Sequence, residues 1–319
     1  MKNKLFLGID TSNYTTSVAV VDIDGNCLAN IKKPLPVKSG ACGLRQSDAV
    51  FFHTQNLPEA MRAAEDYLNV GSLAAIGVSE KPRNVDGSYM PCFLSGVAAA
   101  TAASVASGAR LYRFSHQCGH LMAALHSSGR EDFKTTTFGA FHVSGGTTEL
   151  VRAHFDGAAF ETELVGGTAD LNAGQAIDRI GVLMGLPFPA GPSMEALAKQ
   201  NTKKLPPRKL SVKGTYVHLS GLENLATKLY NETHDKPLVA AFTLTFIAEA
   251  LTAMSRAYIE TYGAQPLLYA GGVMSNGLIK THIRGKFDAA FAEPAFSADN
   301  AVGIALLARH TFLQAEENA

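Results

Sequence analysis

The chain has 319 residues, enough for two domains of ordinary size, each with its own core. Hydrophobic residues make up 46% and charged residues 18%, the balance of a globular protein, and the net charge of zero excludes a global field that would attract nucleic acid or membranes. A local basic patch could still bind RNA. No two cysteines form a C-x-x-C pair, which argues against a disulfide framework and a structural zinc knot.

Two further features bear on location. The basic start, Met1 to Lys4, leads into too few apolar residues for a signal peptide, and the small-residue run from Ser95 to Ala109 is typical of a tightly packed helix. We therefore expect a cytoplasmic protein with no membrane partner.

The first half begins with an apolar strand over Leu5–Asp10, a Thr/Ser-rich turn and a second strand over Ser17–Val21. The next predicted elements are a helix, a strand, a helix and a short strand, over Asp48–Leu68, Ala74–Val78, Phe93–Ser107 and Leu111–Phe114.

The second half repeats this opening, with strands over Phe138–Val143 and Glu149–Ala153 joined by the turn Ser144–Thr148. The later elements are two helices, a basic loop, a long helix, a strand and a closing helix, over Asn172–Met184, Ser193–Gln200, Lys203–Lys213, Pro237–Tyr262, Leu267–Tyr269 and Asp299–Ala315. No low-complexity linker separates the halves, so we expect two similarly built α/β domains around a cleft.

A histidine pair is the sharpest chemical signal. His116 and His120 are four residues apart at the start of a predicted helix over Leu121–His126. Side chains at this spacing share a helix face, so both imidazoles can reach one divalent metal. Two ligands do not complete a site, and a third must come from elsewhere. The alternative is packing without a metal, which is the commoner role of such a pair.

The two hairpin turns are candidate phosphate sites. In Asp10–Thr16 and in Ser144–Thr148, small and hydroxylated residues allow backbone N–H groups to face a phosphate. Asp10, with Ser12 close behind it, could hold a hydrated Mg²⁺. Either turn alone is an ordinary hairpin loop. Together with the Gly271-Gly272 turn they predict a nucleotide held between paired domains.

A series of motifs in order along the whole chain resembles the TsaD family of tRNA threonylcarbamoyladenosine synthases, formerly described as glycoproteases. The motifs are Gly8-Ile9-Asp10-Thr11-Ser12, His116-x-x-Gly119-His120, Val143-Ser144-Gly145-Gly146, Gly271-Gly272-Val273-x-x-Asn276 and Ser297-x-Asp299-Asn300. The resemblance implies the α/β fold of actin, sugar kinases and heat-shock ATPases (the ASKHA fold), with two similar domains around a nucleotide-binding cleft. We place them at residues 1–115 and 116–319, the second with the metal-binding helix and a helical insertion, and the last helix packing back on the N-terminal half.

The resemblance also implies the site. Its metal triad falls on His116, His120 and Asp299, which would hold one iron or zinc ion. Its substrate- and nucleotide-binding residues fall on His142, Val143, Ser144, Gly145, Gly146, Asp178, Gly191 and Asn276. The implied enzyme is an acyltransferase that moves a threonylcarbamoyl group from its adenylate to N6 of a tRNA adenosine near the anticodon. ATP or the acyl-adenylate with Mg²⁺, tRNA, a related ASKHA subunit and an ATPase subunit are the implied ligands and partners.

Several positions depart from the family pattern. Gln117-Cys118 stands where the family has Met-Glu, Thr147 replaces a histidine, and Glu223 replaces a lysine; the segments Asn13–Thr16 and Glu80–Asp86 replace two further motifs. A divergent non-catalytic or regulatory nucleotide-binding paralogue, or a related carbamoyl transferase, is therefore the alternative. A metalloprotease is the weakest hypothesis, because no glutamate stands beside the histidines as in H-E-x-x-H.

Four features have an ordinary interpretation beside the functional one. Cys118 could join the metal, but a small buried filler is favoured. Asp178 could be a solvated carboxylate or an ion-pair partner. The basic loop Lys203–Lys213 could contact tRNA phosphates, but a solvated loop is favoured. His53 is expected on a helix face and is assigned no chemistry.

Overall fold

The computed structural model describes residues 3–12, 14–36 and 44–318. Asn13 of the first hairpin turn and Cys42 lie outside the described residues, as does the start at Met1 and Lys2. The chain forms two compact units. The first comprises residues 1–129, 155–161 and 298–319, and the second comprises residues 130–154 and 162–297.

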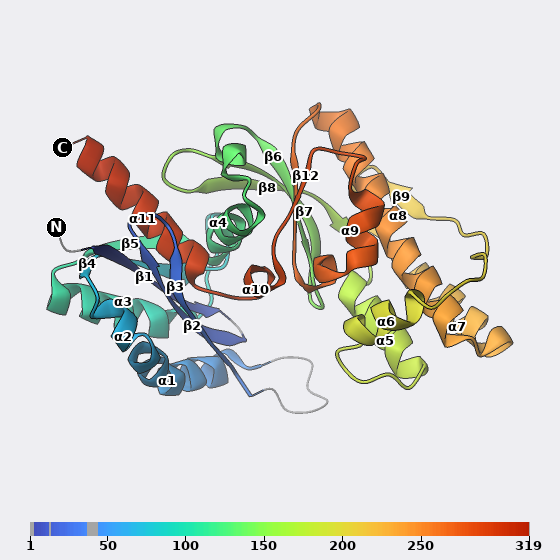
Figure 1. Cartoon of the computed structure of the whole chain (residues 1–319), viewed down its shortest axis with the longest axis horizontal. Helices are drawn as coiled ribbons and strands as arrows, with labels where there is room; N and C mark the ends of the chain where they lie inside the picture. Colours follow the sequence, from blue (N-terminus) through green and yellow to red (C-terminus); the bar gives the residue numbers. More distant parts are fainter. Residues whose placement is uncertain (1–2, 13, 37–43, 319) are drawn as a thin grey trace. The chain divides into compact units, whose positions relative to one another are not determined.

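Unit 1 is built on a five-stranded sheet in the order β3-β2-β1-β4-β5 (Figure 1). Its strands are β1 (Lys4–Ser12), β2 (Thr15–Asp22), β3 (Cys27–Pro34), β4 (Ser72–Lys81) and β5 (Arg110–Ser115). β1 pairs antiparallel with β2 and parallel with β4, and β4 pairs parallel with β5.

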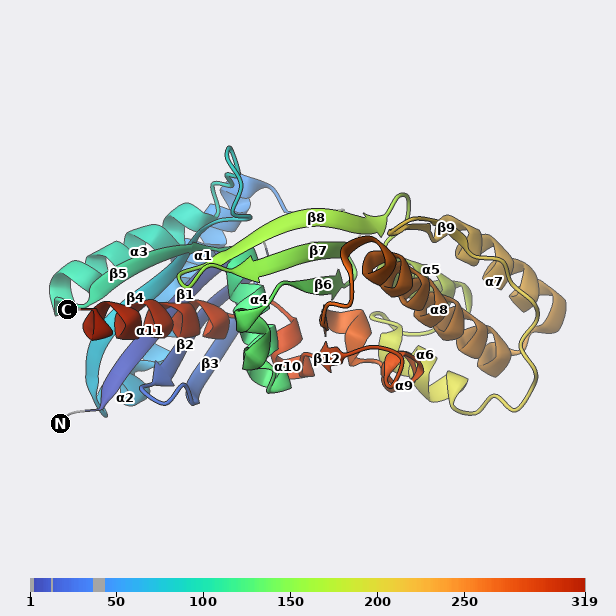
Figure 2. The same cartoon turned by 90° about the horizontal axis from the view of Figure 1, so that it is seen from above.

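Helices cover both faces of this sheet, because successive strand residues point to opposite sides. Leu5, Leu7 and Ile9 of β1 join one core with α1 (Gln46–Ala63) and α3 (Phe93–Ser107). Phe6 and Gly8 face α11 (Val302–Glu317) instead, with the Phe6 ring edge-on to Phe312. The unit also contains α2 (Glu65–Leu68) and α4 (His116–Ser128). Figure 2 shows α3 and α11 on either side of the strands.

Unit 2 is built on a seven-stranded sheet in the order β12-β11-β6-β7-β8-β10-β9. Its strands are β6 (Phe138–Val143), β7 (Thr148–Phe155), β8 (Phe160–Thr168), β9 (Ser211–Lys213), β10 (Tyr216–His218), β11 (Leu267–Ala270) and β12 (Ala289–Phe291). The helices are α5 (Ala173–Leu183), α6 (Gly191–Ala198), α7 (Ser220–Thr233), α8 (Lys236–Tyr262), α9 (Gly277–Ile283) and α10 (Pro294–Ser297), with 3-10 turns η1 (Glu131–Thr135) and η2 (Gly272–Ser275).

The central strands of the two sheets have the same order. In unit 1 the hairpin β1–β2 is extended by parallel strands β4 and β5, and in unit 2 the hairpin β6–β7 is extended by parallel strands β11 and β12. This internal repeat confirms the prediction of two similarly built α/β halves.

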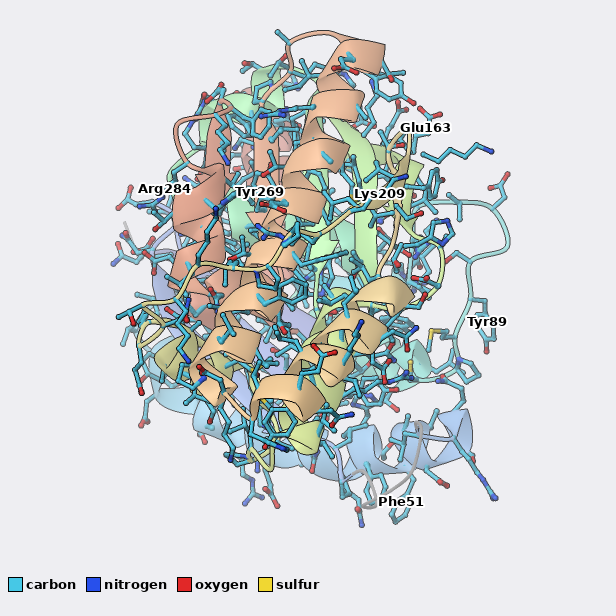
Figure 3. All side chains as sticks on the ribbon, turned by 90° about the vertical axis from the view of Figure 1, so that its right-hand side faces the viewer. Phe51, Tyr89, Glu163, Lys209, Tyr269 and Arg284 are labelled. Atoms are coloured by element: carbon cyan, nitrogen blue, oxygen red, sulfur yellow. The ribbon has the colours of Figure 1, made fainter. Side chains whose placement is uncertain are left out.

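The helix α8 forms the core of unit 2. It is long and apolar enough to cross a membrane by length and composition, but it is mostly buried inside the unit. Ser255 of α8 and Tyr269 of β11 join their hydroxyls at 2.7 Å, both fully buried, and Figure 3 shows Tyr269 in the sheet behind the helix.

The compact units do not follow a division at residue 116. The helix α4 belongs to unit 1 with α11, because the two helices pack closely at Gly119 and Gly303. A Cβ on Gly303 would lie 2.7 Å from the carbonyl carbon of Gly119 and 2.8 Å from the amide nitrogen of Ala123. Only glycine allows this crossing, and it fixes α4 beside the start of α11.

Candidate metal centre and phosphate loop

The two histidines lie on the first turn of α4. Ser115, the last residue of β5, caps the helix by accepting a hydrogen bond from the Cys118 amide at 3.2 Å, so the helix begins at His116 and not at Leu121 as the apolar pattern predicted. The rings of His116 and His120 stand edge to face with their centroids 4.3 Å apart. The i, i+4 spacing therefore places both imidazoles on one helix face, as expected from the sequence.

Asp299 completes the cluster from the segment that leads into α11. Its Oδ1 lies 3.6 Å from Nε2 of His116 and 3.3 Å from Nε2 of His120. One ligand atom from each of the three residues lies within 4.8 Å of the others, so the set can converge on one divalent ion. Two imidazoles and one carboxylate suit iron or zinc, and they leave positions open for a substrate.

A second carboxylate contacts His116 from the opposite side. Asp10, at 1% exposure, lies with its Oδ2 2.7 Å from Nδ1 of His116, and its Oδ1 accepts a hydrogen bond from the Ser12 amide at 2.8 Å. Both oxygens of Asp10 therefore have protein partners. The sequence suggested that Asp10 and Ser12 bind Mg²⁺ or phosphate. In the structure Asp10 instead bonds to His116 and to the Ser12 amide, a role that the sequence did not indicate.

The charges in this cluster depend on one another. Burial lowers the pKa of His116, but Asp10 and Asp299 outweigh it and raise that pKa to about 10. Burial raises the pKa of Asp10 and of Asp299, but the histidines outweigh it, so both carboxyl pKa values are lowered. Without a metal, the cluster is therefore an ion-paired network centred on the His116 imidazolium.

Two nearby residues have packing roles. Cys118 is buried, its Sγ donates to the Phe160 carbonyl at 3.4 Å, and burial raises its pKa, so its thiol stays protonated as a buried filler would. His53 of α1 is fully buried, with Nδ1 2.8 Å from the Thr16 hydroxyl. Lys32 of β3 is a cation near Asp299 that the sequence patterns missed; burial lowers its pKa, while Asp299 opposes this.

The glycine turn of unit 2 is held by hydrogen bonds between its own residues. The Ser144 amide donates to the Thr147 carbonyl at 2.7 Å, and the Thr147 amide donates to the Ser144 hydroxyl at 3.1 Å. Gly145 and Gly146 are exposed at the tip, and a Cβ on either would meet nothing within 4 Å. The turn therefore presents open backbone to a ligand, as a phosphate loop requires.

Two other segments approach this turn closely. Gly174, in the first turn of α5, donates its amide to the Ser144 carbonyl at 3.2 Å, and a Cβ there would lie 2.6 Å from the Gly145 Cα. Gly271, with φ of 100°, packs against Val143, where a Cβ would lie 2.6 Å from the carbonyl carbon. The two predicted glycine turns of this half thus meet at the end of β6, and Gly174 of α5, which was not predicted, joins them. His142 and Val143 precede the turn within β6, and the Val143 side chain is fully buried, so Val143 offers a ligand its backbone alone.

The predicted nucleoside-binding residues are partly engaged. Asp178 of α5 accepts a hydrogen bond from the Ala190 amide at 2.8 Å, just before Gly191 begins α6. Asn276 caps α9, its side-chain oxygen accepting from the Leu278 and Ile279 amides at 3.0 and 3.1 Å. Each side chain keeps other polar atoms for a ligand, but one oxygen of each already orders its own loop.

One departure from the family pattern is compensated within unit 2. Glu223, which stands in place of a lysine, lies 3.0 Å from Arg179, the residue after Asp178. In the basic loop, Lys203 pairs with Asp235 at 2.6 Å and Arg208 with Glu249 at 2.7 Å, so part of the loop's charge is neutralised within the unit. Figure 3 shows Lys209 of this loop alongside α8. These pairs favour the solvated-loop interpretation.

Comparison with known proteins identifies the relatives of this chain. The family model of the tRNA N6-adenosine threonylcarbamoyltransferase TsaD matches residues 43–306. An enzyme of that name from Streptococcus suis (strain 05ZYH33) is 32% identical over 86% of this chain and 82% of its own length. One from Streptococcus equi subsp. zooepidemicus (strain MGCS10565) is 30% identical over 97% of this chain and 92% of its own.

Solved structures show the fold. Full-length HypF in the phosphate- and nucleotide-bound form matches with a TM-score of 0.61 and 10% identity, covering 99% of this chain and 56% of HypF. A glucokinase of the ROK family from Streptomyces griseus matches with a TM-score of 0.52 and 14% identity, covering 96% and 99%. The expected fold of actin, sugar kinases and heat-shock ATPases is confirmed.

Proposed function

Because this chain belongs to the TsaD family of tRNA N6-adenosine threonylcarbamoyltransferases, and is thereby a transferase enzyme, we propose that it moves a threonylcarbamoyl group from threonylcarbamoyl-adenylate to N6 of a tRNA adenosine near the anticodon. The observation that carries the proposal is the convergence of His116, His120 and Asp299 in unit 1, since an open three-ligand site suits acyl transfer.

The metal residues are proposed to hold iron or zinc. Both histidines direct Nε2 toward the Asp299 carboxylate, and the ligand atoms are close enough for one ion, so the residues present fit the group. When bound, the ion would supply a Lewis acid for the carbonyl of the acyl group. The chain's own part is to hold the two imidazoles at fixed spacing on α4 and to keep the carboxylate beside them.

The donor's nucleotide part is proposed to bind unit 2. The exposed backbone of Gly145 and Gly146 would receive the phosphate, and His142, Val143 and Ser144 would line the approach along β6. Asp178, Gly191 and Asn276 would hold the nucleoside, with ATP and Mg²⁺ as the related ligands.

The acceptor and partners complete the proposal. We propose tRNA as acceptor, a related ASKHA subunit and an ATPase subunit as partners, and the cytoplasm as location. The Arg179–Glu223 pair favours a second candidate, a regulatory paralogue that binds nucleotide without transfer, because Glu223 of α7 puts a negative charge against Arg179, the neighbour of Asp178. Nothing favours a metalloprotease, since Gln117 occupies the position where H-E-x-x-H requires its glutamate.

A direct assay separates these two candidates. The purified chain is incubated with threonylcarbamoyl-adenylate, tRNA and purified partner proteins, and modified adenosine is measured. We expect product with the wild-type protein. No product under conditions in which a family enzyme from Streptococcus suis is active, while nucleotide still binds, would favour the regulatory paralogue.

Metal content tests the centre separately. We expect His116→Ala to lose the metal that copurifies with the wild-type protein. The matched control is His126→Ala, which removes a histidine of the same helix outside the triad. Equal metal content in both variants would show that the ligand assignment is wrong.

A further inference from the structure

Asp10 contacts the metal centre without belonging to the ligand triad. It lies near the end of β1, far from α4 in sequence, and its carboxylate is almost completely shielded from solvent. One oxygen accepts from the Ser12 amide at 2.8 Å and the other lies 2.7 Å from Nδ1 of His116. Both oxygens are therefore engaged by groups of the protein itself.

The geometry determines where the His116 proton resides. An ionised carboxylate has no hydrogen to donate, so Nδ1 of His116 must be the donor in this pair. To bind a metal, the imidazolium gives up its Nε2 proton and keeps the proton on Nδ1, so the lone pair is on Nε2, which is the atom 3.6 Å from Asp299. The ring is also fixed from a third side, where the Phe93 ring lies 6.2 Å away between centroids.

We propose that Asp10 is the positioning residue of the metal centre, holding His116 in the tautomer and orientation that direct Nε2 at the ion. This assigns Asp10 to the metal and not to Mg²⁺ or phosphate. The inference rests on the metal centre of the proposed function, but it is independent of the donor and acceptor. Its test therefore needs neither tRNA nor nucleotide.

The substitution Asp10→Asn leaves a side chain that can accept only one of the two hydrogen bonds. A carboxamide has one oxygen and one NH₂ group, whereas Ser12 N–H and His116 Nδ1–H both require an acceptor. If the oxygen stays with Ser12, the NH₂ group faces Nδ1 and the imidazole proton moves to Nε2, the ligand atom. If the amide turns over, the Ser12 amide is left unpaired in a buried turn.

The probe is zinc added to metal-free protein, with affinity measured by competition with a chromophoric chelator. We expect Asp10→Asn to bind zinc about 10- to 100-fold more weakly, and the visible spectrum of the cobalt-substituted protein to change. The control is Asp22→Asn, whose carboxylate accepts from Asp24 and Asn26 at a turn of the same sheet. It should bind zinc as the wild type does.

Two outcomes would overturn the proposal. The first is an Asp10→Asn protein that has the circular dichroism and melting temperature of the Asp22→Asn control and binds zinc within about threefold of wild type. The second uses the unaltered protein, so it holds even if Asp10→Asn does not fold. In the zinc-loaded wild type, ¹⁵N spectra of the histidine rings should show His116 protonated at Nδ1 and bound through Nε2. Zinc on Nδ1 would exclude the proposed role.

Discussion

Gly303→Ala tests whether the crossing of α4 and α11 holds the metal centre together. A Cβ at this position would lie 2.7 Å from the carbonyl carbon of Gly119, whereas carbon atoms pack at about 3.5 Å or more. The Gly119 carbonyl oxygen would lie closer still, so the helices would have to separate by more than about 1 Å. The obstructing atoms belong to the backbone of α4, so no side-chain rotation can relieve the clash.

The expected cost has two parts. Overpacking of this kind lowers the free energy of unfolding by about 1–3 kcal/mol, and we expect the upper end because both surfaces are backbone. Asp299 lies just before α11 and the histidines lie on α4, so the same displacement would widen the Nε2–Oδ1 distances of 3.3 and 3.6 Å. We expect zinc affinity to fall by about tenfold or more.

Urea unfolding followed by circular dichroism measures the first effect, and chelator competition measures the second. Gly119→Ala is a graded comparison, because its Cβ would meet the end of the Ile304 side chain at 2.8 Å, which can move. Gly221→Ala in α7 is the matched control, because its Cβ would meet nothing within 4 Å. Gly303→Ala protein as stable as the control, with wild-type zinc affinity, would refute the argument.

Three further predictions concern single side chains. Burial raises the pKa of Asp170, but bonds from Ser220 and neighbouring amides outweigh it and lower that pKa to about 2. Because Asp170 is exposed and solvent screens its interactions, Asp170→Asn should cost about 1 kcal/mol of unfolding free energy at pH 7. Because the folded pKa of Asp170 is depressed, its contribution to stability is complete above pH 4 and is lost as the pH falls toward 2. The urea midpoints of the variant and the wild type should therefore converge near pH 2, and a difference that stays constant with pH would contradict the prediction. Tyr269→Phe removes the buried bond to Ser255 and should cost about 1 kcal/mol in the same unfolding assay, and an unchanged midpoint would count against that bond. His120→Ala should abolish tight zinc binding in the chelator assay while leaving unit 2 unaffected, as judged by nucleotide binding.

The elements with strong apolar patterns were predicted well from the sequence. The helix over Phe93–Ser107 and the strand over Phe138–Val143 have the predicted bounds. β3 was not predicted, because its Lys32 and Lys33 interrupt the apolar alternation of this edge strand. The start of α4 was placed too late, since the Ser115 cap depends on a hydrogen bond that apolar spacing does not show.

The site could be predicted only as far as local spacing extends. His116 and His120 follow from helical periodicity, which depends on neighbours along the chain. Asp299 was predicted as the third ligand from the family resemblance alone, because no periodicity relates it to α4. The Asp10–His116 bond joins residues 106 positions apart, and no pattern in the sequence around either residue predicts this contact. His53 lies on a helix as expected, and the structure adds that this face of α1 is buried, with His53 against Thr16.

The discontinuity of unit 1 has a consequence for synthesis on the ribosome. Strands β1 to β5 leave the ribosome early, but α11, which covers one face of their sheet, follows all of unit 2 in the chain. Until it emerges, Phe6 and its neighbours on that face lack their cover, so the nascent chain exposes an apolar surface that favours aggregation. Asp299 emerges with α11, so the complete ligand set exists only late in translation. Metal can therefore bind to all three ligands only after the segment with Asp299 has packed against α4.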